Sequence, residues 1–146
     1  MSVAVATDPT AVANRLRPAL LRLSRELRRE THSLGVTGGQ VSLLIKIQDE
    51  RGIELRELAR WERMSVPGMS KYVARLEAAR LVRRTQLADR RRFGLEVTPE
   101  GARVLASVKR RRTAWLAARL RNLDPEELDA VDAAVAPLLK LLEVPA

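Results

Sequence analysis

Cysteine is absent from the 146-residue chain, and histidine occurs once, as His32. Disulfides, thiolate chemistry and a zinc site built from cysteine and histidine are therefore excluded. The sequence also carries no phosphate-binding glycine loop and no histidine that pairs with a nucleophile. We expect neither an enzyme nor a protein that holds a metal or another cofactor.

Aromatic residues and long apolar runs are also scarce. Phenylalanine, tryptophan and tyrosine together make up 3% of the chain, too little for the stacking platforms that bind single-stranded nucleic acid. No apolar run approaches the length of a membrane-spanning helix, and the N-terminal residues lack the basic-then-apolar order of a secretory signal. These observations predict a cytoplasmic protein.

Negative charge is outnumbered: 27 lysines and arginines stand against 18 acidic residues, which gives a formal net charge of +9. Such an excess creates a positive field that attracts polyanions. Because 46% of the residues are hydrophobic, we expect a folded core rather than a disordered basic tail. The length fits one compact domain or one subunit of a small oligomer.

The N-terminal part of the chain predicts a flexible arm, residues 1–9, followed by a helix from Thr10 to about Ser33. The apolar residues of this helix recur three and four positions apart. They are Val12, Leu16, Leu20, Leu23 and Leu27, and the other face carries Arg15, Arg22, Arg25, Arg28 and Arg29. Pro18 is expected to kink the helix or to mark a later start.

The middle of the chain predicts two helices joined by a turn and followed by a hairpin. Residues 55–62 and 65–79 have helical periodicity, and Ser65 is placed to cap the second helix. The buried face of that helix is expected to consist of Val66, Met69, Val73 and Leu76. Residues 81–86 and 93–97 are typical of two antiparallel strands around a basic loop. Before them, Thr37 to Gln40 has capping-box spacing for a further helix.

Two more helices are predicted at the C-terminal end. Thr98-Pro99-Glu100 and Asp124-Pro125-Glu126 each place a cap, a proline and an acid in the order that starts a helix. The last helix has an apolar stripe of Leu128, Val131, Val135, Leu138 and Leu142, and Lys109 to Arg112 is interpreted as a solvated basic run. Pro137 is expected to kink or break the last helix near Ala133.

Together these elements predict a mainly α-helical fold with a small β wing. Residues 36–98 form the winged helix-turn-helix, and residues 10–34 and 99–146 supply dimerisation helices, because one subunit can hardly bury both terminal stripes. The second helix of such a pair lays its N-terminal residues in the major groove of double-stranded DNA. A wing tipped with arginine suits the narrow, negative minor groove.

The same segments carry a family resemblance. The motifs are Ser65-Val66-Pro67-Gly68-Met69-Ser70-Lys71, Arg75-Leu76-Glu77, Leu81-Val82-Arg83-Arg84, Asp89-Arg90-Arg91-Arg92 and Leu95-Glu96-Val97-Thr98-Pro99-Glu100-Gly101. Over roughly residues 12–143 the chain resembles the MarR-type transcriptional regulators of bacteria. The resemblance implies a homodimer whose first and last two helices interlock on a palindromic operator. It also implies repression, relieved when a small, commonly aromatic acid enters a cleft between the dimer and DNA-binding regions.

Candidate DNA contacts fall into two groups. The recognition-helix group is Ser65, Pro67, Gly68, Ser70, Lys71 and Arg75, and the wing group is Arg84, Asp89, Arg90, Arg91 and Arg92. Alternatively, Lys71 and Arg75 are the solvated face of an amphipathic helix, and Arg91 is an exposed hairpin tip. Asp89 either orients Arg91 through an ion pair or forms the turn.

Candidates for lining an effector cleft are Arg15, His32 and Trp61. The competing interpretation makes His32 a capping or surface residue. Trp61 and Trp115 are alternatively anchors of the core or of the dimer interface. With no cysteine to oxidise, an effector is expected to act without a covalent bond.

Two positions depart from the family pattern. Gly68 stands where a hydroxyl side chain is common, and Arg80 stands where glycine usually follows the recognition helix. Either Arg80 adopts a strained left-handed conformation and gains a phosphate contact, or the junction is rebuilt without a left-handed residue.

Two other classes of function compete with a specific regulator. An architectural protein would bind DNA through charge with little sequence preference. A peripheral membrane protein would use the arginine-rich first helix, although its apolar stripe suits dimerisation better. Competition between specific and random DNA distinguishes a specific regulator from an architectural protein. Liposome sedimentation tests the peripheral membrane protein.

Overall fold

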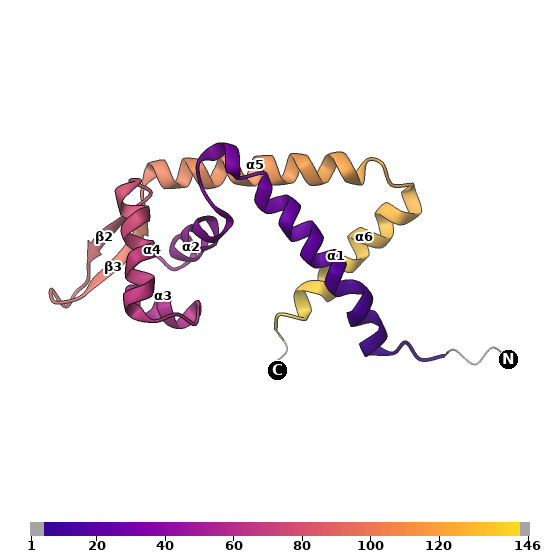
Figure 1. Cartoon of the computed structure of the whole chain (residues 1–146), viewed down its shortest axis with the longest axis horizontal. Coiled ribbons are helices and arrows are strands. Elements are labelled where there is room, and N and C mark those ends of the chain that lie inside the picture. Colours follow the sequence, from indigo (N-terminus) through magenta and orange to yellow (C-terminus); the bar gives the residue numbers. More distant parts are fainter. Residues whose placement is uncertain (1–4, 144–146) are drawn as a thin grey trace.

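The computed structural model describes residues 5–143, and its central feature is the long helix α5 (Pro99–Leu120). Short helices and a small sheet gather at the N-terminal end of α5, whereas α6 (Pro125–Lys140) follows its C-terminal end. Helix α1 (Pro9–Arg29) starts near the chain's N-terminus and reaches the middle of α5 (Figure 1). Thus α5 connects two differently built parts of the molecule.

The helix-turn-helix consists of α3 (Leu55–Trp61) and α4 (Val66–Ala78), preceded by α2 (Gly38–Asp49). The capping box predicted at Thr37 is present, with both reciprocal hydrogen bonds to Gln40. The cap predicted at Ser65 is also confirmed, because its hydroxyl accepts a hydrogen bond from the backbone N–H of Gly68 at 3.1 Å. Local caps therefore set the start of both helices.

The sheet has three antiparallel strands in the order β1-β3-β2. The predicted pair is confirmed as β2 (Val82–Gln86) and β3 (Phe93–Val97), with Arg84 opposite Leu95. The third strand, β1 (Ile53–Glu54), was not predicted from the sequence and pairs with β3. A side chain at Gly94 would come within 2.4 Å of the Gly52 carbonyl oxygen, so glycine permits this close pairing.

The hydrophobic core lies among α2, α3, α4, the sheet and the first half of α5. Leu44, Ile47, Leu58, Met69 and Leu76 are completely buried there. The predicted inward face of α4 is confirmed at Met69, Val73 and Leu76, but the expectation for Val66 is wrong, since 42% of that residue is exposed. Val66 is the first residue of α4, and it points from the helix end toward the wing.

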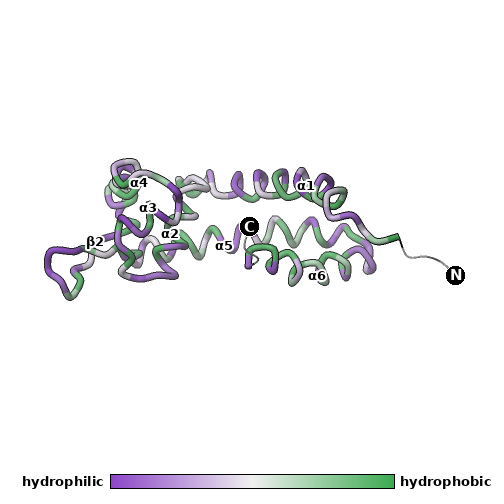
Figure 2. Tube along the Cα trace, turned by 90° about the horizontal axis from the view of Figure 1, so that it is seen from below, coloured by the Kyte–Doolittle hydropathy of each residue, from purple (hydrophilic) through white to green (hydrophobic). Residues whose placement is uncertain are grey.

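The outer helices contain no buried residue among those described, in either α1 or α6. Leu20, Leu23 and Val131 are each more than two-fifths exposed, and half of Val135 is exposed. The two helices cross in Figure 1, but the view from below separates them (Figure 2). Their apolar stripes therefore remain open in the single chain.

The predicted later start of α1 and the predicted break in α6 are wrong. Helix α1 begins at Pro9 and continues through Pro18, and α6 continues through Pro137 to Lys140. A proline leaves the carbonyl four residues earlier without its helical donor. Those carbonyls belong to Asn14 and Ala133, which are exposed, so water can take the donor's place.

The predicted arm and C-terminal region reach beyond the described residues. Residues 1–4 and 144–146 lie outside them, and residues 5–8 have no regular structure. Helix α1 ends at Arg29, before the predicted Ser33, and a short 3-10 turn covers His32–Leu34.

Candidate nucleic-acid interface

The outward face of α4 carries the predicted recognition residues. Ser65, Pro67, Lys71 and Arg75 are exposed, whereas Gly68 and Ser70 are half-buried. The Arg75 guanidinium lies 5.9 Å from the centre of the Tyr72 ring, which is itself 44% exposed. Tyr72 is a candidate contact that sequence reasoning missed, because helical periodicity alone gives no reason to select it.

A left-handed arginine lies two residues beyond the end of each helix of the helix-turn-helix. Arg63 has φ 55° and Arg80 has φ 61°, and they are the non-glycine residues with positive φ in the described chain. After α4, the N–H of Arg80 donates to the carbonyl of Glu77 and the N–H of Leu81 donates to that of Leu76. This pair of backbone hydrogen bonds is the Schellman motif, which usually has glycine at the position that Arg80 occupies here. The alternative of a junction without a left-handed residue is therefore wrong.

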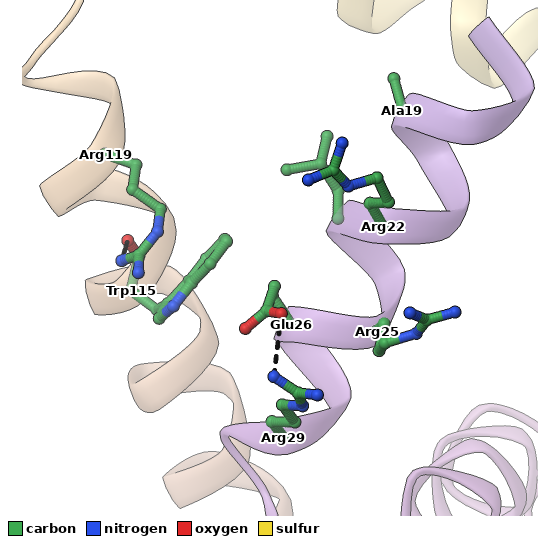
Figure 3. Close-up of a pocket in the computed structure, with 8 residues that line it drawn as sticks. Ala19, Arg22, Arg25, Glu26, Arg29, Trp115 and Arg119 are labelled. Carbon is green, nitrogen blue, oxygen red and sulfur yellow. Dashed lines mark hydrogen bonds and ion pairs between the residues drawn. The ribbon is translucent and has the colours of Figure 1, made fainter.

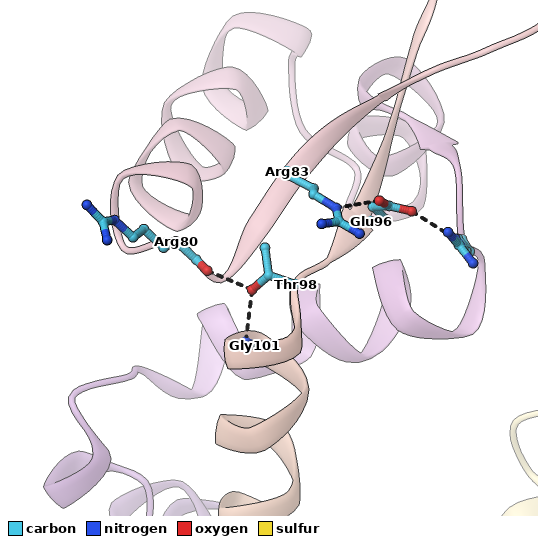
Figure 4. A network of polar contacts seen from close by, with 6 residues as sticks. Arg80, Arg83, Glu96, Thr98 and Gly101 are labelled. Atoms are coloured by element: carbon cyan, nitrogen blue, oxygen red, sulfur yellow. Dashed lines mark hydrogen bonds and ion pairs between the residues drawn. The ribbon is translucent and has the colours of Figure 1, made fainter.

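Helix α5 holds the carbonyl of Arg80 in place (Figure 4). The Thr98 hydroxyl donates to the Arg80 carbonyl oxygen at 2.6 Å and accepts from the N–H of Gly101 at 3.0 Å. A side chain at Gly101 would meet the Leu81 carbonyl oxygen at 2.2 Å. The end of α4, the sheet and α5 are thus joined at one point by the Thr98 hydroxyl and the backbone atoms around it.

The tip of the wing, residues 87–92, is built around Asp89. Its carboxylate accepts a hydrogen bond from the backbone N–H of Arg91 at 3.1 Å, and its carbonyl accepts one from Arg92. No ion pair joins Asp89 to the Arg91 guanidinium among the described residues. The turn-forming interpretation of Asp89 is confirmed, and the side chains of Arg90 and Arg91 project without an acidic partner in that same part of the chain.

The other two wing arginines have acidic partners. Arg84 on β2 pairs with Glu77 of α4 at 3.3 Å, and Arg92 pairs with Glu54 of β1. The hydrogen bond that the Arg92 guanidinium donates to the Glu54 carboxylate, together with the charge of Glu54, raises the pKa of Arg92. These pairs attach the wing to the helix-turn-helix. Arg84 and Arg92 therefore orient the wing, whereas Arg90 and Arg91 have no such role in the described part of the chain.

A cavity of about 290 Å³ separates α4 from the wing. It brings predicted residues of both groups together, namely Ser70 from α4 and Arg84, Arg91 and Arg92 from the wing. Its lining also includes three residues that sequence reasoning missed, which are Arg56, Val66 and Phe93. Phe93, the first residue of β3, is 52% exposed. An apolar side chain therefore lines the cavity together with the wing arginines.

Behind the wing, one carboxylate holds two arginines (Figure 4). Arg83 and Glu96 face each other across β2 and β3, and Arg51 also binds Glu96, at 2.8 Å. Hydrogen bonds from Arg83, which has the larger effect, and from Arg51 hold the pKa of the Glu96 carboxyl below its usual value. This cluster connects the sheet to the end of α2.

The predicted effector residues are not brought together. Arg15 lies near the start of α1, exposed His32 lies in the 3-10 turn, and Trp61 ends α3 with the Lys46 ammonium 5.1 Å from its ring. Trp61 is 45% exposed, so it is not a core anchor. Trp115 is half-buried on α5 beneath the Arg119 guanidinium.

A different cavity, of about 480 Å³, lies where α1, α2 and α5 meet. Its apolar lining is Leu20, Leu23, Leu27, Ile45 and Leu116, and its cations are Arg28 and Arg112. Burial lowers the pKa of the Arg112 guanidinium, and the neighbouring charge of Arg28 lowers it further by a smaller amount. No carboxylate lines this cavity, so an apolar pocket contains two arginines without a counter-ion.

The prediction of a solvated basic run on α5 is wrong for Arg112, which is half-buried, whereas Lys109, Arg110 and Arg111 are exposed. The Arg112 guanidinium donates to the Leu27 carbonyl at 3.2 Å, and Arg111 donates to the Ser33 hydroxyl at 2.5 Å. Both contacts join residues far apart in the sequence. They fasten the end of α1 and the 3-10 turn that follows it to α5.

Within residues 5–143, histidine, aspartate and glutamate form no group that could hold a metal ion. In the same part of the chain, every helix is too short or too polar to cross a membrane.

Comparisons with known proteins agree with this architecture. Residues 36–93 match the model of the MarR family. An HTH-type transcriptional regulator of Mycobacterium tuberculosis is 32% identical over 133 residues, which cover 90% of this chain and 93% of the relative. The transcriptional regulator Tm0710 from Thermotoga maritima is similar in structure, with a TM-score of 0.77, 26% identity and coverage of 92% and 95%.

A further structural relative was solved with nucleic acid. It is a mutant of MepR from Staphylococcus aureus bound to an oligodeoxyribonucleotide, with a TM-score of 0.69 and 19% identity. The similarity covers 90% of this chain and 97% of that protein. At this identity the likeness concerns the fold.

Proposed function

This chain belongs to the MarR family of helix-turn-helix transcriptional regulators, which are not enzymes, and we propose that it is a repressor that binds a palindromic operator as a homodimer. The observation that carries the proposal is the pairing of an exposed, basic α4 face with a wing whose Arg90 and Arg91 lack acidic partners among the described residues. Operator binding by a twofold dimer would place the two recognition helices in successive major grooves, roughly 10 base pairs apart.

On DNA, α4 and the wing would enter neighbouring grooves. One sugar–phosphate backbone separates a major groove from the adjacent minor groove, and it would run through the cavity between α4 and the wing. Arg56, Arg91 and Ser70 line that cavity as donors for phosphate oxygens. Lys71 and Arg75, on the outward face of α4, would approach base edges or phosphates.

We further propose that a small apolar carboxylate, such as an aromatic acid, is the effector. The cavity among α1, α2 and α5 supports this class, because its arginines Arg28 and Arg112 have an apolar surround and no carboxylate in the lining. A carboxylate would relieve the repulsion between the two cations. The cavity touches α1 and α2 together, so a ligand that fits one arrangement of these helices better would shift the dimer toward it.

The decisive experiment is selection of duplexes from a random DNA library, followed by competition with unselected DNA. A specific regulator should enrich an inverted repeat and retain it against a large excess of random duplex. Enrichment of no sequence, with equal competition by random DNA, would instead support the architectural alternative, in which charge alone binds DNA. Thermal-shift screening with salicylate-like acids tests the effector: stabilisation by none of a broad panel would refute it.

A further inference from the structure

The two faces of the β2–β3 hairpin have different neighbours. Arg84 and Leu95 lie opposite each other on these strands, and both line the cavity between α4 and the wing. Arg83 and Glu96, the adjacent pair on the same strands, both line a second cavity of about 320 Å³. Because successive residues of a strand point to opposite faces, the second cavity lies on the side of the hairpin away from the proposed DNA contacts.

Residues from the end of α2, from both strands and from the start of α5 line this second cavity. Its charged side chains are Arg51, which follows α2, Arg83 on β2 and Glu96 on β3. The remaining lining is uncharged and includes Ile47, Gln48, Val97, Pro99 and Ala102. The lining of this space, which we call the Arg51–Arg83 cavity, thus contains two cations and one carboxylate, so its net charge favours an anion.

Each of the two guanidiniums binds Glu96 through one nitrogen. The Nε of Arg51 donates to Oε2 of Glu96 at 2.8 Å, and the Nε of Arg83 donates to Oε1 (Figure 4). Within the described residues, the terminal Nη groups of both arginines make no hydrogen bond. The side chains of Arg51 and Arg83 are 80% and 57% exposed, whereas that of Glu96 is 10% exposed. Glu96 therefore orients both guanidiniums and leaves their Nη groups accessible to a ligand.

The chemistry of two guanidiniums on one carboxylate selects the class of anion. A guanidinium presents its N–H groups in a planar fork that matches two oxygens of one oxyanion. A carboxylate has two oxygens and satisfies one such fork. A phosphoryl group carries three acceptor oxygens and up to two negative charges, so it can accept hydrogen bonds from both. Because Glu96 already orients the two arginines, binding costs little additional side-chain entropy.

We propose that the Arg51–Arg83 cavity binds a phosphoryl group, supplied as inorganic phosphate or as a small phosphate monoester. The inference goes beyond the proposed function and does not depend on it, because the lining contains no residue of α4 or of the wing tip. An occupant would join the end of α2 to β2 on the face of the hairpin that points away from DNA.

Titration of the full chain with sodium phosphate, followed by two-dimensional NMR of backbone amides, tests the site. The ionic strength is held constant with sodium chloride, so that the screening of all other cations does not change. We expect saturable shifts across the millimolar range, largest around Arg51, Arg83 and Glu96. Glycerol phosphate distinguishes the two sources: tighter binding than phosphate indicates a monoester, and equal or weaker binding indicates inorganic phosphate. Sodium acetate should bind much more weakly than either.

The variant R51K/R83K keeps both positive charges beside Glu96 but removes the two planar forks. Its dissociation constant for phosphate should rise roughly tenfold or more, while its melting temperature in chloride should stay near that of the wild type. R51K alone changes a side chain that is 80% exposed, so it measures a smaller loss of the same kind if the double variant is unstable. Arg103 and Arg110 are exposed on α5 outside the lining, so the matched control R103K/R110K should bind phosphate like the wild type.

Several results would overturn the proposal. The absence of saturable shifts across the millimolar range would show that the cavity binds no phosphoryl group. Unchanged phosphate affinity in the folded variants R51K and R51K/R83K would show that the forks take no part. Largest shifts around Arg28 and Arg112 would assign the anion to the cavity among α1, α2 and α5, and acetate that binds as tightly as phosphate would contradict recognition of a third oxygen. Failure of the chain to select a DNA sequence would leave all these outcomes unchanged, so the two proposals can fail separately.

Discussion

The DNA-binding part of the chain and its outer helices solve the problem of burial differently. Between Val36 and Val108, α2, α3, α4, the sheet and the first half of α5 enclose a continuous core. Helices α1 and α6 enclose nothing, although they have as clear an apolar stripe as α4. A stripe therefore predicts burial, but only the three-dimensional arrangement tells whether the covering surface belongs to the same chain.

The contrast extends to charge. In the DNA-binding part, arginines that meet an acid hold the wing in place, as Arg84 does with Glu77 and Arg92 does with Glu54. In the cavity between α1 and α5 that Trp115 lines, helix α1 contributes Arg22, Arg25 and Arg29 but only one acid, Glu26 (Figure 3). We infer that paired cations maintain the structure and that unpaired cations mark the surfaces that meet DNA or a second subunit.

The largest expected effect separates the two regions by substitution. Leu76→Ala removes a completely buried side chain of α4 and should destabilise the chain by about 2–5 kcal/mol. This loss should not depend on protein concentration. Leu128→Ala, at a residue that is 41% exposed in α6, should act mainly on the dimer, so its effect on thermal unfolding should change with concentration.

Urea unfolding at two protein concentrations measures both variants. The two variants could instead lose the same free energy of unfolding at both protein concentrations. That result would show that the outer helices share the core of the single chain, and would contradict the proposed difference between the two regions.

A second prediction separates unpaired from paired cations within the wing. Arg91→Ala should weaken DNA binding about tenfold and reduce the salt slope by roughly one counterion, since one phosphate contact is lost. Arg92→Ala removes the partner of Glu54 and should reduce affinity by loosening the wing, with little change in slope. Filter binding or fluorescence anisotropy at several salt concentrations provides both quantities. Normal binding by Arg91→Ala would contradict the proposed wing contact, and neither variant should alter dimerisation.

Much of this architecture could be predicted, because the signals that define it are local. Caps at Thr37, Ser65, Thr98 and Asp124 each require one side chain and the N–H three residues later, so sequence alone specifies them. The β2–β3 hairpin likewise follows from alternation on both sides of a polar loop.

What could not be predicted depends on residues distant in the sequence. The two-residue strand β1 is too short to show a period, and it forms because Gly94 admits the backbone of Gly52. The pairing of Arg92 with Glu54 spans 38 positions, and that of Arg112 with Leu27 spans 85. For this reason the sequence did not reveal the acidic partners of Arg84 and Arg92, or the pocket that Arg112 lines.

A smaller effect tests the strain at the end of α4. Because Arg80 has φ 61°, Arg80→Gly should raise the free energy of unfolding by about 0.5–1 kcal/mol, the relief of strain exceeding the added freedom of the unfolded chain. Ala79→Gly is the matched control, since Ala79 is right-handed and should be destabilised by glycine.

DNA affinity of Arg80→Gly should stay equal or fall, depending on whether the guanidinium reaches a phosphate. A lower melting temperature for Arg80→Gly would contradict the account of a strained junction.

The smallest effect concerns acid and the cluster behind the wing. The folded-state pKa of Glu96 is lowered by Arg83 and Arg51, so its stabilising contribution is present above the ordinary glutamate value of about 4.3 and is lost as the pH falls through the lowered folded value. Glu96→Gln should therefore be less stable than the wild type at pH 7 and equal to it in strong acid. Thermal melts across pH test this. A difference that persists below both pKa values would assign the loss to packing instead of charge.

Hydrogen exchange at two protein concentrations tests the central contrast most directly. Amides of α2, α4 and the first half of α5 should be protected equally at both concentrations, because the single chain encloses them. Amides of α1 and α6 should exchange markedly faster after dilution below the dimer dissociation constant. Protection of α1 and α6 that equals the protection of α4 and does not change with concentration would contradict the account, because the outer helices would then need no second copy.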